Sequence, residues 1–315
     1  MNRNPDDNRF PPGPDTPQPV GVDPATLELL TRLRDEYGDI VAITKPNGRQ
    51  AYFINDAAEV RKLLVRHHSR YQKGPGFERV KMLLGNGLIV SDGETWRRSR
   101  RMIQPAFTRQ NVHRLIGLMM ECAEARIARW KPVADAGGVL DITQEMSDFA
   151  LELILRCIFG ADYERSILSQ GENPFAFLSK DAERNLRIVM QVRETRDLIL
   201  QVINERRVRD DSDALDFLSM YMNATDKNGA GFSDEELLDE IVTLIVAGYE
   251  TSAGTLNWAW YLVAGHEEAE KPLLAEAREL LANPATVDQQ TLADMHYTQQ
   301  LLEETLRLYP PVWIF

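Results

Sequence analysis

The chain has 315 residues, of which 43% are hydrophobic and 27% are charged, and its formal net charge is -12. This composition is typical of a globular protein and excludes a disordered chain, and the length is sufficient to bury a large core. The acidic excess disfavours nucleic acid or an anionic membrane as the main partner. We interpret the charge as a contribution to solubility.

The sequence contains no sign of a membrane or secreted protein. Residues 1–19 lack the apolar core of a signal peptide, and no stretch reaches the ~18 uninterrupted apolar residues of a membrane span. Cys122 and Cys157 lie in apolar, helix-like surroundings without metal-ligand spacing. We expect free buried thiols, which suit a reducing compartment, and therefore a cytoplasmic protein.

The N-terminal region combines an arm, a helix and a hairpin. Residues 1–23 are proline-rich and polar, and we expect an arm without regular structure. Asp23 or Pro24 then begins a short amphipathic helix, whose apolar face carries Leu27, Leu30, Leu33 and Tyr37. Residues 40–45 and 50–54 alternate in polarity around an Asn-Gly turn, which predicts a β-hairpin.

Beyond the hairpin, apolar residues recur at helical spacing in almost every segment. The predicted helices occupy residues 56–66, 93–106, 110–131, 141–160, 183–208, 234–264, 267–282 and 296–308. Glycine, proline and asparagine separate several of them. With no repeat and no linker, residues 24–315 are predicted to form one mostly helical domain with a small sheet near its N-terminus.

One predicted helix is unusually long. Ser233 and Glu236 form a capping-box pattern, and the apolar periodicity continues to Ala264. About thirty helical residues correspond to about 45 Å, enough to cross a domain. This helix is therefore expected to be central.

The centre of this helix, residues 247–252, reads AGYETS. A glycine costs about 1 kcal/mol in a helix interior, and burying a carboxylate costs more. Close helix packing would explain Ala247 and Gly248 alone, and Glu250 could face solvent. For the whole run on so long a helix, we favour a functional site lying against it.

This run resembles the oxygen-binding motif of cytochromes P-450, in which a small residue and glycine are followed by any residue, an acid and a threonine. Three further stretches resemble the same family in the right order. The stretch from Trp96 to Arg100 resembles its WxxxR motif, Glu304 to Arg307 its ExxR motif, and residues 10–14 its proline-rich lead-in. The resemblance implies the cytochrome P-450 fold, mostly α with a long central I-helix and a small N-terminal β-sheet, incomplete at the C-terminus.

The resemblance implies that Trp96 and Arg100 bind the haem propionates, through an indole N–H and a guanidinium one helical turn apart. The alternative is that Trp96 is a core residue and the arginines form a solvated face. Ala247 and Gly248 would leave room for dioxygen and the haem plane. The neighbouring arginines are expected to face solvent, where they could meet an acidic redox protein: Arg97, Arg98 and Arg101.

The resemblance also implies roles for Thr251 and Glu250. A helical threonine can donate a hydrogen bond to the carbonyl four residues earlier and bend the helix. Thr251 would stabilise iron-bound dioxygen, and Glu250 would help to deliver protons. Glu304 and Arg307, three apart on one helix face, would belong to a structural network and not to catalysis.

The haem iron of this family is held by a cysteine thiolate in a glycine-containing loop downstream of the ExxR motif. This chain stops at Phe315, in what we expect to be the start of a strand. Neither Cys122 nor Cys157 has the required context, so no metal ligand is assigned. We expect this chain by itself to bind haem weakly or not at all, and to be inactive.

The leading hypothesis is a haem b monooxygenase that inserts one atom of dioxygen into an apolar organic substrate, such as a fatty acid or terpenoid. Electrons would come from NAD(P)H through a separate ferredoxin or flavodoxin-type partner. A peroxygenase or isomerase of the same fold is less favoured, because Glu250 and Thr251 suit oxygen activation. The other alternative is a truncated, non-catalytic helical relative that binds a ligand or a partner.

Overall fold

The computed structural model describes residues 10–21, 23–74, 76–168, 171, 173–180, 186–209, 215–280 and 286–314. The chain divides after Gln72 into two compact units, and Ile314 belongs with the first of them. No sequence signal predicted a boundary at this point. Each unit is described separately.

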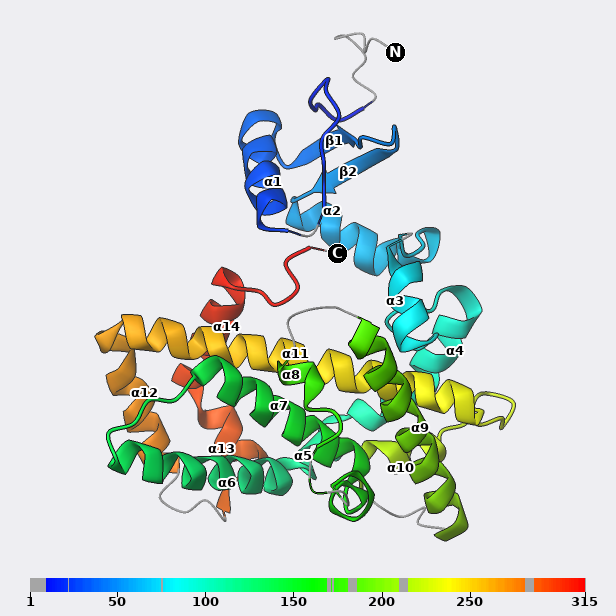
Figure 1. Ribbon diagram of the computed structural model, residues 1–315. Helices are drawn as coiled ribbons and strands as arrows, with labels where there is room; N and C mark the ends of the chain where they lie inside the picture. Colours follow the sequence, from blue (N-terminus) through cyan, green and yellow to red (C-terminus); the bar gives the residue numbers. More distant parts are fainter. Residues whose placement is uncertain are drawn as a thin grey trace. The chain divides into compact units, whose positions relative to one another are not determined.

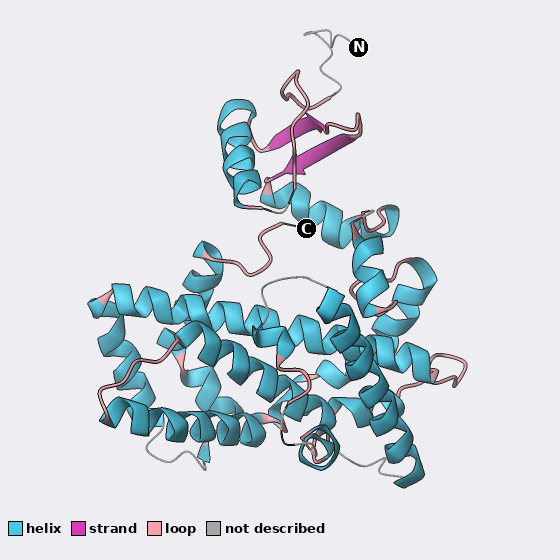
Figure 2. Ribbon diagram, viewed as in Figure 1, coloured by secondary structure: helices cyan, strands magenta, loops and turns pink. Residues whose placement is uncertain are grey.

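The first unit contains the predicted helix and hairpin. Helix α1 (Pro24–Tyr37) begins after Asp23, whose carboxylate accepts a hydrogen bond from the Thr26 amide at 2.8 Å. Strands β1 (Ile40–Thr44) and β2 (Gln50–Ile54) pair antiparallel (Figure 2). The hairpin is therefore confirmed, and α1 begins where the predicted arm ends.

Apolar residues of α1 and β1 form the core of the first unit: Leu29, Leu30, Leu33, Val41 and Ile43. The described part of the arm has no regular structure, as predicted, and follows β1. The Ala42 amide donates to the Pro12 carbonyl at 2.8 Å, and the Gln18 amide donates to the Thr44 carbonyl at 2.8 Å. In place of one helix over 56–66, α2 (Ala57–Arg61) continues as a π-helical turn at Lys62–Arg66.

The second unit is helical throughout its described part (Figure 1). Its helices are α3 (Phe77–Leu84), α4 (Gly93–Ile103), α5 (Arg109–His113), α6 (Ile116–Asp135), α7 (Ile142–Phe159), α8 (Phe177–Lys180), α9 (Leu186–Arg209), α10 (Phe217–Met222), α11 (Asp234–Gly265), α12 (Glu267–Leu280), α13 (Gln289–Asp294) and α14 (His296–Leu308). Among the residues described, no helix has the length and apolar character needed to cross a membrane.

These helices confirm most of the predicted segments, with corrected boundaries. The helix expected at 93–106 ends at Ile103 and continues as a 3₁₀ turn, because Pro105 has no N–H to donate. The segment expected at 110–131 is two helices, α5 and α6. The prediction missed four short helices, α3, α8, α10 and α13, and residues 183–185 and 281–282 of two predicted helices lie outside the described part.

The core of this unit is built on α11. Helix α7 packs along it, and the two run side by side (Figure 1). The largest fully buried side chains of this unit come mainly from α7, α9, α10 and α11: Leu151, Leu155, Ile158, Phe159, Ile167, Ile199, Ile203, Leu218, Tyr221 and Leu237. Helix α11 is therefore central, as its length predicted.

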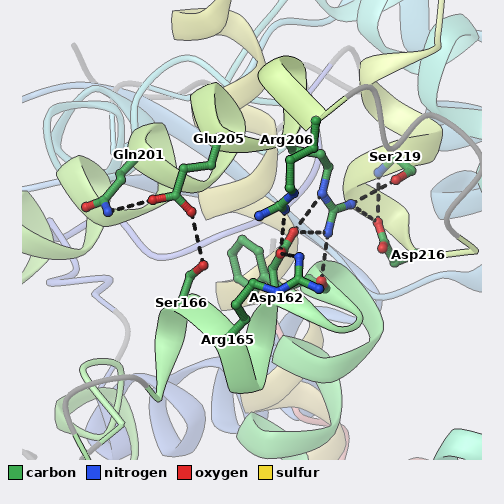
Figure 3. A network of polar contacts seen from close by, with 10 residues as sticks. Asp162, Arg165, Ser166, Gln201, Glu205, Arg206, Asp216 and Ser219 are labelled. Carbon is green, nitrogen blue, oxygen red and sulfur yellow. Dashed lines mark hydrogen bonds and ion pairs between the residues drawn. The ribbon is translucent and has the colours of Figure 1, made fainter.

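A buried ion cluster joins α9 to the segments that follow α7 and precede α10 (Figure 3). The side chain of Arg206 is only 3% exposed, as is that of Asp162. Its guanidinium donates to the Asp162 carboxylate at 2.6 and 2.8 Å and to the Phe159 carbonyl at 2.8 Å. It also donates to Asp216 and Ser219. All five of its N–H groups thus have acceptors, the condition under which a buried guanidinium is tolerated.

We expect Arg206→Met to lower the free energy of unfolding by about 3–5 kcal/mol, because buried Asp216 loses its arginine partner and buried Asp162 keeps only the more exposed Arg165 and Arg209. Urea denaturation followed by circular dichroism measures the change. The matched control is Arg207→Met. Arg207 forms an exposed ion pair with Asp234, and its loss should change stability by no more than about 0.5 kcal/mol. If the two substitutions lowered the free energy of unfolding equally, burial of the cluster would not explain its contribution to stability.

Candidate functional site

Helix α11 carries the predicted site and begins as the sequence predicted. The Ser233 hydroxyl accepts from the Glu236 amide at 3.2 Å, and the Glu236 carboxylate accepts from the Ser233 amide at 2.9 Å. The helix then continues for 32 residues to Gly265, a length of about 48 Å.

The hydroxyl of Thr251 donates to the Ala247 carbonyl at 2.8 Å, which is the backbone hydrogen bond predicted for this residue. Thr255, one turn further on, repeats it and donates to the Thr251 carbonyl at 2.9 Å. The helix is continuous through this region. The prediction missed Thr255, although its spacing of four from Thr251 places both on one face.

Thr251 lies in the wall of an open groove of about 590 Å³ between α11, α14 and the segment that follows α14. Three hydroxyl residues and six apolar residues line it: Thr251, Ser252, Thr255, Leu256, Leu302, Leu306, Pro310, Pro311 and Val312. Ring stacking of Trp258 on Tyr309, with centroids 4.1 Å apart, holds the segment after α14 against α11. Residues 312–314, which we expected to begin a strand, are irregular.

Glu250 and Gly248, the other key positions of the motif, face different surroundings. Glu250 is exposed, which agrees with the alternative that its carboxylate faces solvent. A Cβ atom at Gly248 would lie 2.7 Å from Cδ1 of Ile154 on α7. Close packing of α7 on α11 therefore explains this glycine, and its role beside a cofactor stays a prediction.

Glu304 and Arg307, which were predicted to share one face of a helix, form an ion pair. The guanidinium donates two hydrogen bonds of 2.7 Å to the carboxylate, and both side chains are exposed. The hydrogen bonds from Arg307, and then its charge, hold the pKa of Glu304 below its ordinary value. The pair lies at the surface in the described part of the chain.

The Glu276 carboxylate on α12 fixes the start of α14. It accepts from the amides of Tyr297 and Thr298 at 2.8 Å and from the Thr298 hydroxyl at 2.6 Å. Desolvation acts against a lower pKa for Glu276, but these hydrogen bonds outweigh it, and the pKa falls below its ordinary value. This contact helps to place the α14 wall of the groove.

Helix α4 presents Trp96 and Arg100 as the sequence predicted, four residues apart on one face. Trp96 is half-buried, whereas Arg100 is exposed and makes no hydrogen bond or ion pair with the residues described. The Arg100 guanidinium is thus available for an anionic group. The structure does not bring this pair into the described lining of the groove.

The expectation that Arg98 faces solvent was wrong. Its guanidinium pairs with Asp226 at 3.1 Å and with Glu236 at 2.9 Å, and it lies over the Phe232 ring. The segment before α11 folds back onto α4, which a sequence pattern could not reveal. Arg97 pairs with Glu94, and Arg101 remains exposed.

The prediction missed two buried acids, Asp239 and Glu240, in the first half of α11. Asp239 accepts from Arg196 on α9 at 2.7 Å, and Glu240 accepts from the Leu88 amide at 2.9 Å. Burial raises the pKa of Glu240, and hydrogen bonds from Leu88 and Ser99 oppose this only in part. The signal was present in the sequence, because both acids interrupt an apolar helical stretch, as Glu250 does.

Cys122 and Cys157 are free and buried, as predicted. Desolvation raises the pKa of Cys157 to about 12 and also raises that of Cys122. Neither thiol is therefore poised to act as a thiolate ligand at neutral pH. The described residues contain no cluster of three or more metal-ligating side chains.

The close packing at Gly248 gives a comparison within one helix. Gly254→Ala should raise stability, because a Cβ there makes only ordinary contacts at 3.9 Å with Pro311. We expect Gly248→Ala to be less stable than Gly254→Ala by about 1–2 kcal/mol, since its Cβ overpacks Ile154. Thermal denaturation measures both. In an Ile154→Ala background the Gly248→Ala change should become stabilising, and a penalty that persists there would contradict the packing explanation.

The raised pKa of Glu240 predicts a pH dependence. Between the ordinary pKa of 4.5 and the raised pKa of the folded protein, the Glu240 carboxyl keeps its proton in the folded protein but loses it in the unfolded chain. The free energy of unfolding therefore declines as pH rises from 4.5 through the folded pKa. Glu240→Gln removes this loss, and its free energy of unfolding relative to wild type should increase with pH over that window. The charged neighbours Asp239, Glu236 and Lys73 are common to both proteins. Parallel curves in urea denaturation between about pH 4.5 and 8 would exclude the effect.

Comparison with known proteins agrees with these motifs. The chain matches the Cytochrome P450 family over residues 20–315. It is 31% identical to cyclooctatin synthase of Streptomyces melanosporofaciens, over 92% of this chain and 65% of that protein. It is 30% identical to cyclooctat-9-en-7-ol 5-monooxygenase of the same organism, with 91% and 64% covered. It is also 30% identical to pentalenene oxygenase of Streptomyces avermitilis, with 89% and 64% covered.

The chain thus spans 64–65% of the length of these curated relatives. The family match covers nearly all of the chain, including the α4, α11 and α14 motifs. The chain belongs to the cytochrome P450 family.

Proposed function

We propose that the protein is a haem b monooxygenase that inserts one atom of dioxygen into an apolar organic substrate. The observation that carries this proposal is the groove beside Thr251, which combines hydroxyl groups on α11 with apolar walls. Its volume of about 590 Å³ lies within the usual range for small-molecule sites, about 300–1,000 Å³. Family membership supports the same chemistry.

The residues present fit a haem with two anionic propionates. Arg100 offers an exposed guanidinium without a described partner, and Trp96 offers an indole N–H one turn away. When bound, haem supplies the redox-active iron that activates dioxygen. Neither Cys122 nor Cys157 is proposed as its ligand, because both are buried thiols with raised pKa values.

Residues of α11 would deliver protons, and apolar residues of α14 would exclude water. The Glu250 carboxylate is exposed, so it can exchange protons with solvent and pass them towards the adjacent Thr251. The Thr251 hydroxyl proton is donated to the Ala247 carbonyl, which leaves the Oγ1 lone pairs to accept a hydrogen bond in the groove. Apolar side chains opposite, such as Leu302, would keep bulk water out.

The apolar lining supports a terpenoid or fatty-acid substrate, and the names of two relatives, which refer to cyclooctat-9-en-7-ol and pentalenene, support the first of these. We propose that electrons arrive from NAD(P)H through a ferredoxin or flavodoxin-type protein. Such a partner would meet exposed cations such as Arg101. The cytoplasm is the proposed compartment, because both cysteines are unpaired.

Titration of haemin into the purified 315-residue chain tests the cofactor site. We expect weak but saturable binding with a defined Soret shift. Arg100→Gln should weaken it about tenfold or more, the value of a charge-assisted hydrogen bond of about 1.5–3 kcal/mol. Arg101→Gln is the matched control, since it removes an exposed arginine at the next position.

Three results would contradict parts of the proposal. No saturable Soret shift would favour a non-catalytic relative for this chain. Equal effects of Arg100→Gln and Arg101→Gln would remove Arg100 from the cofactor site. A thiolate-type band in the carbon monoxide difference spectrum would show that Cys122 or Cys157 binds the iron after all.

A further inference from the structure

The loop from Gly85 to Ser91, which leads into α4, is bound to α11 through its backbone. The Asn86 amide donates to Oδ2 of Asp239 at 2.6 Å, and the Leu88 amide donates to Oε2 of Glu240 at 2.9 Å. Two adjacent carboxylates thus satisfy two loop amides.

The two glycines of this loop permit the close approach. A Cβ atom at Gly87 would lie 2.2 Å from Oγ1 of Thr243 and 2.5 Å from the Asp239 carbonyl oxygen. A Cβ at Gly85 would lie 1.9 Å from Asp239 Oδ1. Gly87 has no positive φ, so contact with α11 alone explains why it is glycine.

Lys73 and Arg196 add contacts to the loop and to the residues around it. Lys73 donates to the carbonyls of Leu88 at 2.9 Å and Ser91 at 2.6 Å. Arg196 on α9 donates to Asp239 at 2.7 Å and to the Leu84 carbonyl at the end of α3 at 3.4 Å. Two amides of the loop, of Asn86 and Leu88, are therefore bound by α11, and two of its carbonyls, of Leu88 and Ser91, are bound by Lys73.

Only Asp92 separates this loop from the start of α4, so the direction of α4 depends on where the loop is docked. A second contact joins α4 to α11, through Arg98 and Glu236. Ser99 on α4 also donates a hydrogen bond to Glu240 itself. These attachments to α11 together determine the placement of α4, and with it the placement of Trp96 and Arg100.

We propose that Asp239 and Glu240 are positioning residues that dock the 85–91 loop on α11 and so place Trp96 and Arg100 for binding the anionic cofactor. This inference rests on the proposed function for its cofactor. The docking itself rests on contacts within the chain. Glu240 acts as a hydrogen-bond acceptor, so an amide oxygen can replace its carboxylate, whereas a methyl group cannot.

The test is backbone hydrogen exchange read by mass spectrometry on the full chain, together with haemin titration. Glu240→Ala and Gly87→Ala should increase exchange in residues 86–91 and in α4, because the amides lose their docked state. Haemin affinity should fall about tenfold, the usual effect of losing a residue that orients a ligand. Glu240→Gln and Gly117→Ala are the matched controls, since a Cβ at Gly117 meets nothing within 4 Å, and neither should speed exchange or weaken haemin binding.

Circular dichroism confirms that each variant folds. Faster exchange confined to the loop, with α4 and haemin affinity unchanged, would overturn the proposal. Unchanged exchange in both Glu240→Ala and Gly87→Ala would also overturn it. If the wild-type chain shows no haemin binding, the proposed function fails, and exchange in α4 alone then decides whether these acids position that helix.

Discussion

The structure of the second unit depends on the burial of the first half of α11. A buried carboxylate without partners is strongly disfavoured, so each of the two buried acids in that half must be met by donors from elsewhere. Asp239 is met by Arg196 and the Asn86 amide, and Glu240 by the Leu88 amide. Because the two buried carboxylates of α11 need hydrogen-bond donors, α9, the 85–91 loop and α4 all pack against the first half of this helix.

Ion pairs with buried carboxylates fix helix α9 at two points along its length. Arg196 reaches Asp239 on α11, and ten residues later Arg206 reaches Asp162 and Asp216. Ten residues correspond to about 15 Å of helix, so the two attachments prevent α9 from both sliding and rotating. Buried ion pairs add little net stability against an apolar alternative, but they penalise any arrangement that separates the partners.

The second half of α11 has the opposite character. Glu250 is exposed, and Thr251 borders an open groove in place of a packed core. Close packing persists on the side of α7, where Gly248 lets Ile154 approach, and at Trp258, which stacks on Tyr309. One helix thus combines a first half held by buried ion pairs and hydrogen bonds with a second half in which Glu250 is exposed and Thr251 lines the groove.

The sequence by itself determined the features that depend on local spacing, either within about four residues of a helix or across one short turn. The hairpin, the capping box of α11 and the backbone hydrogen bond of Thr251 could all be predicted, because local spacing decides them. The family motifs could be recognised for the same reason. The pairing of Glu304 with Arg307 also follows from a spacing of three.

Only the tertiary structure decided which polar residues are buried. Glu250 and Glu240 look alike in sequence, as acids within apolar helical stretches, yet the first is exposed and the second is buried. Arg98 and Arg101 likewise differ only in what folds against them. These outcomes depend on which helix covers each face of α11 and α4. Such contacts join residues up to about 150 positions apart, beyond the reach of any local pattern.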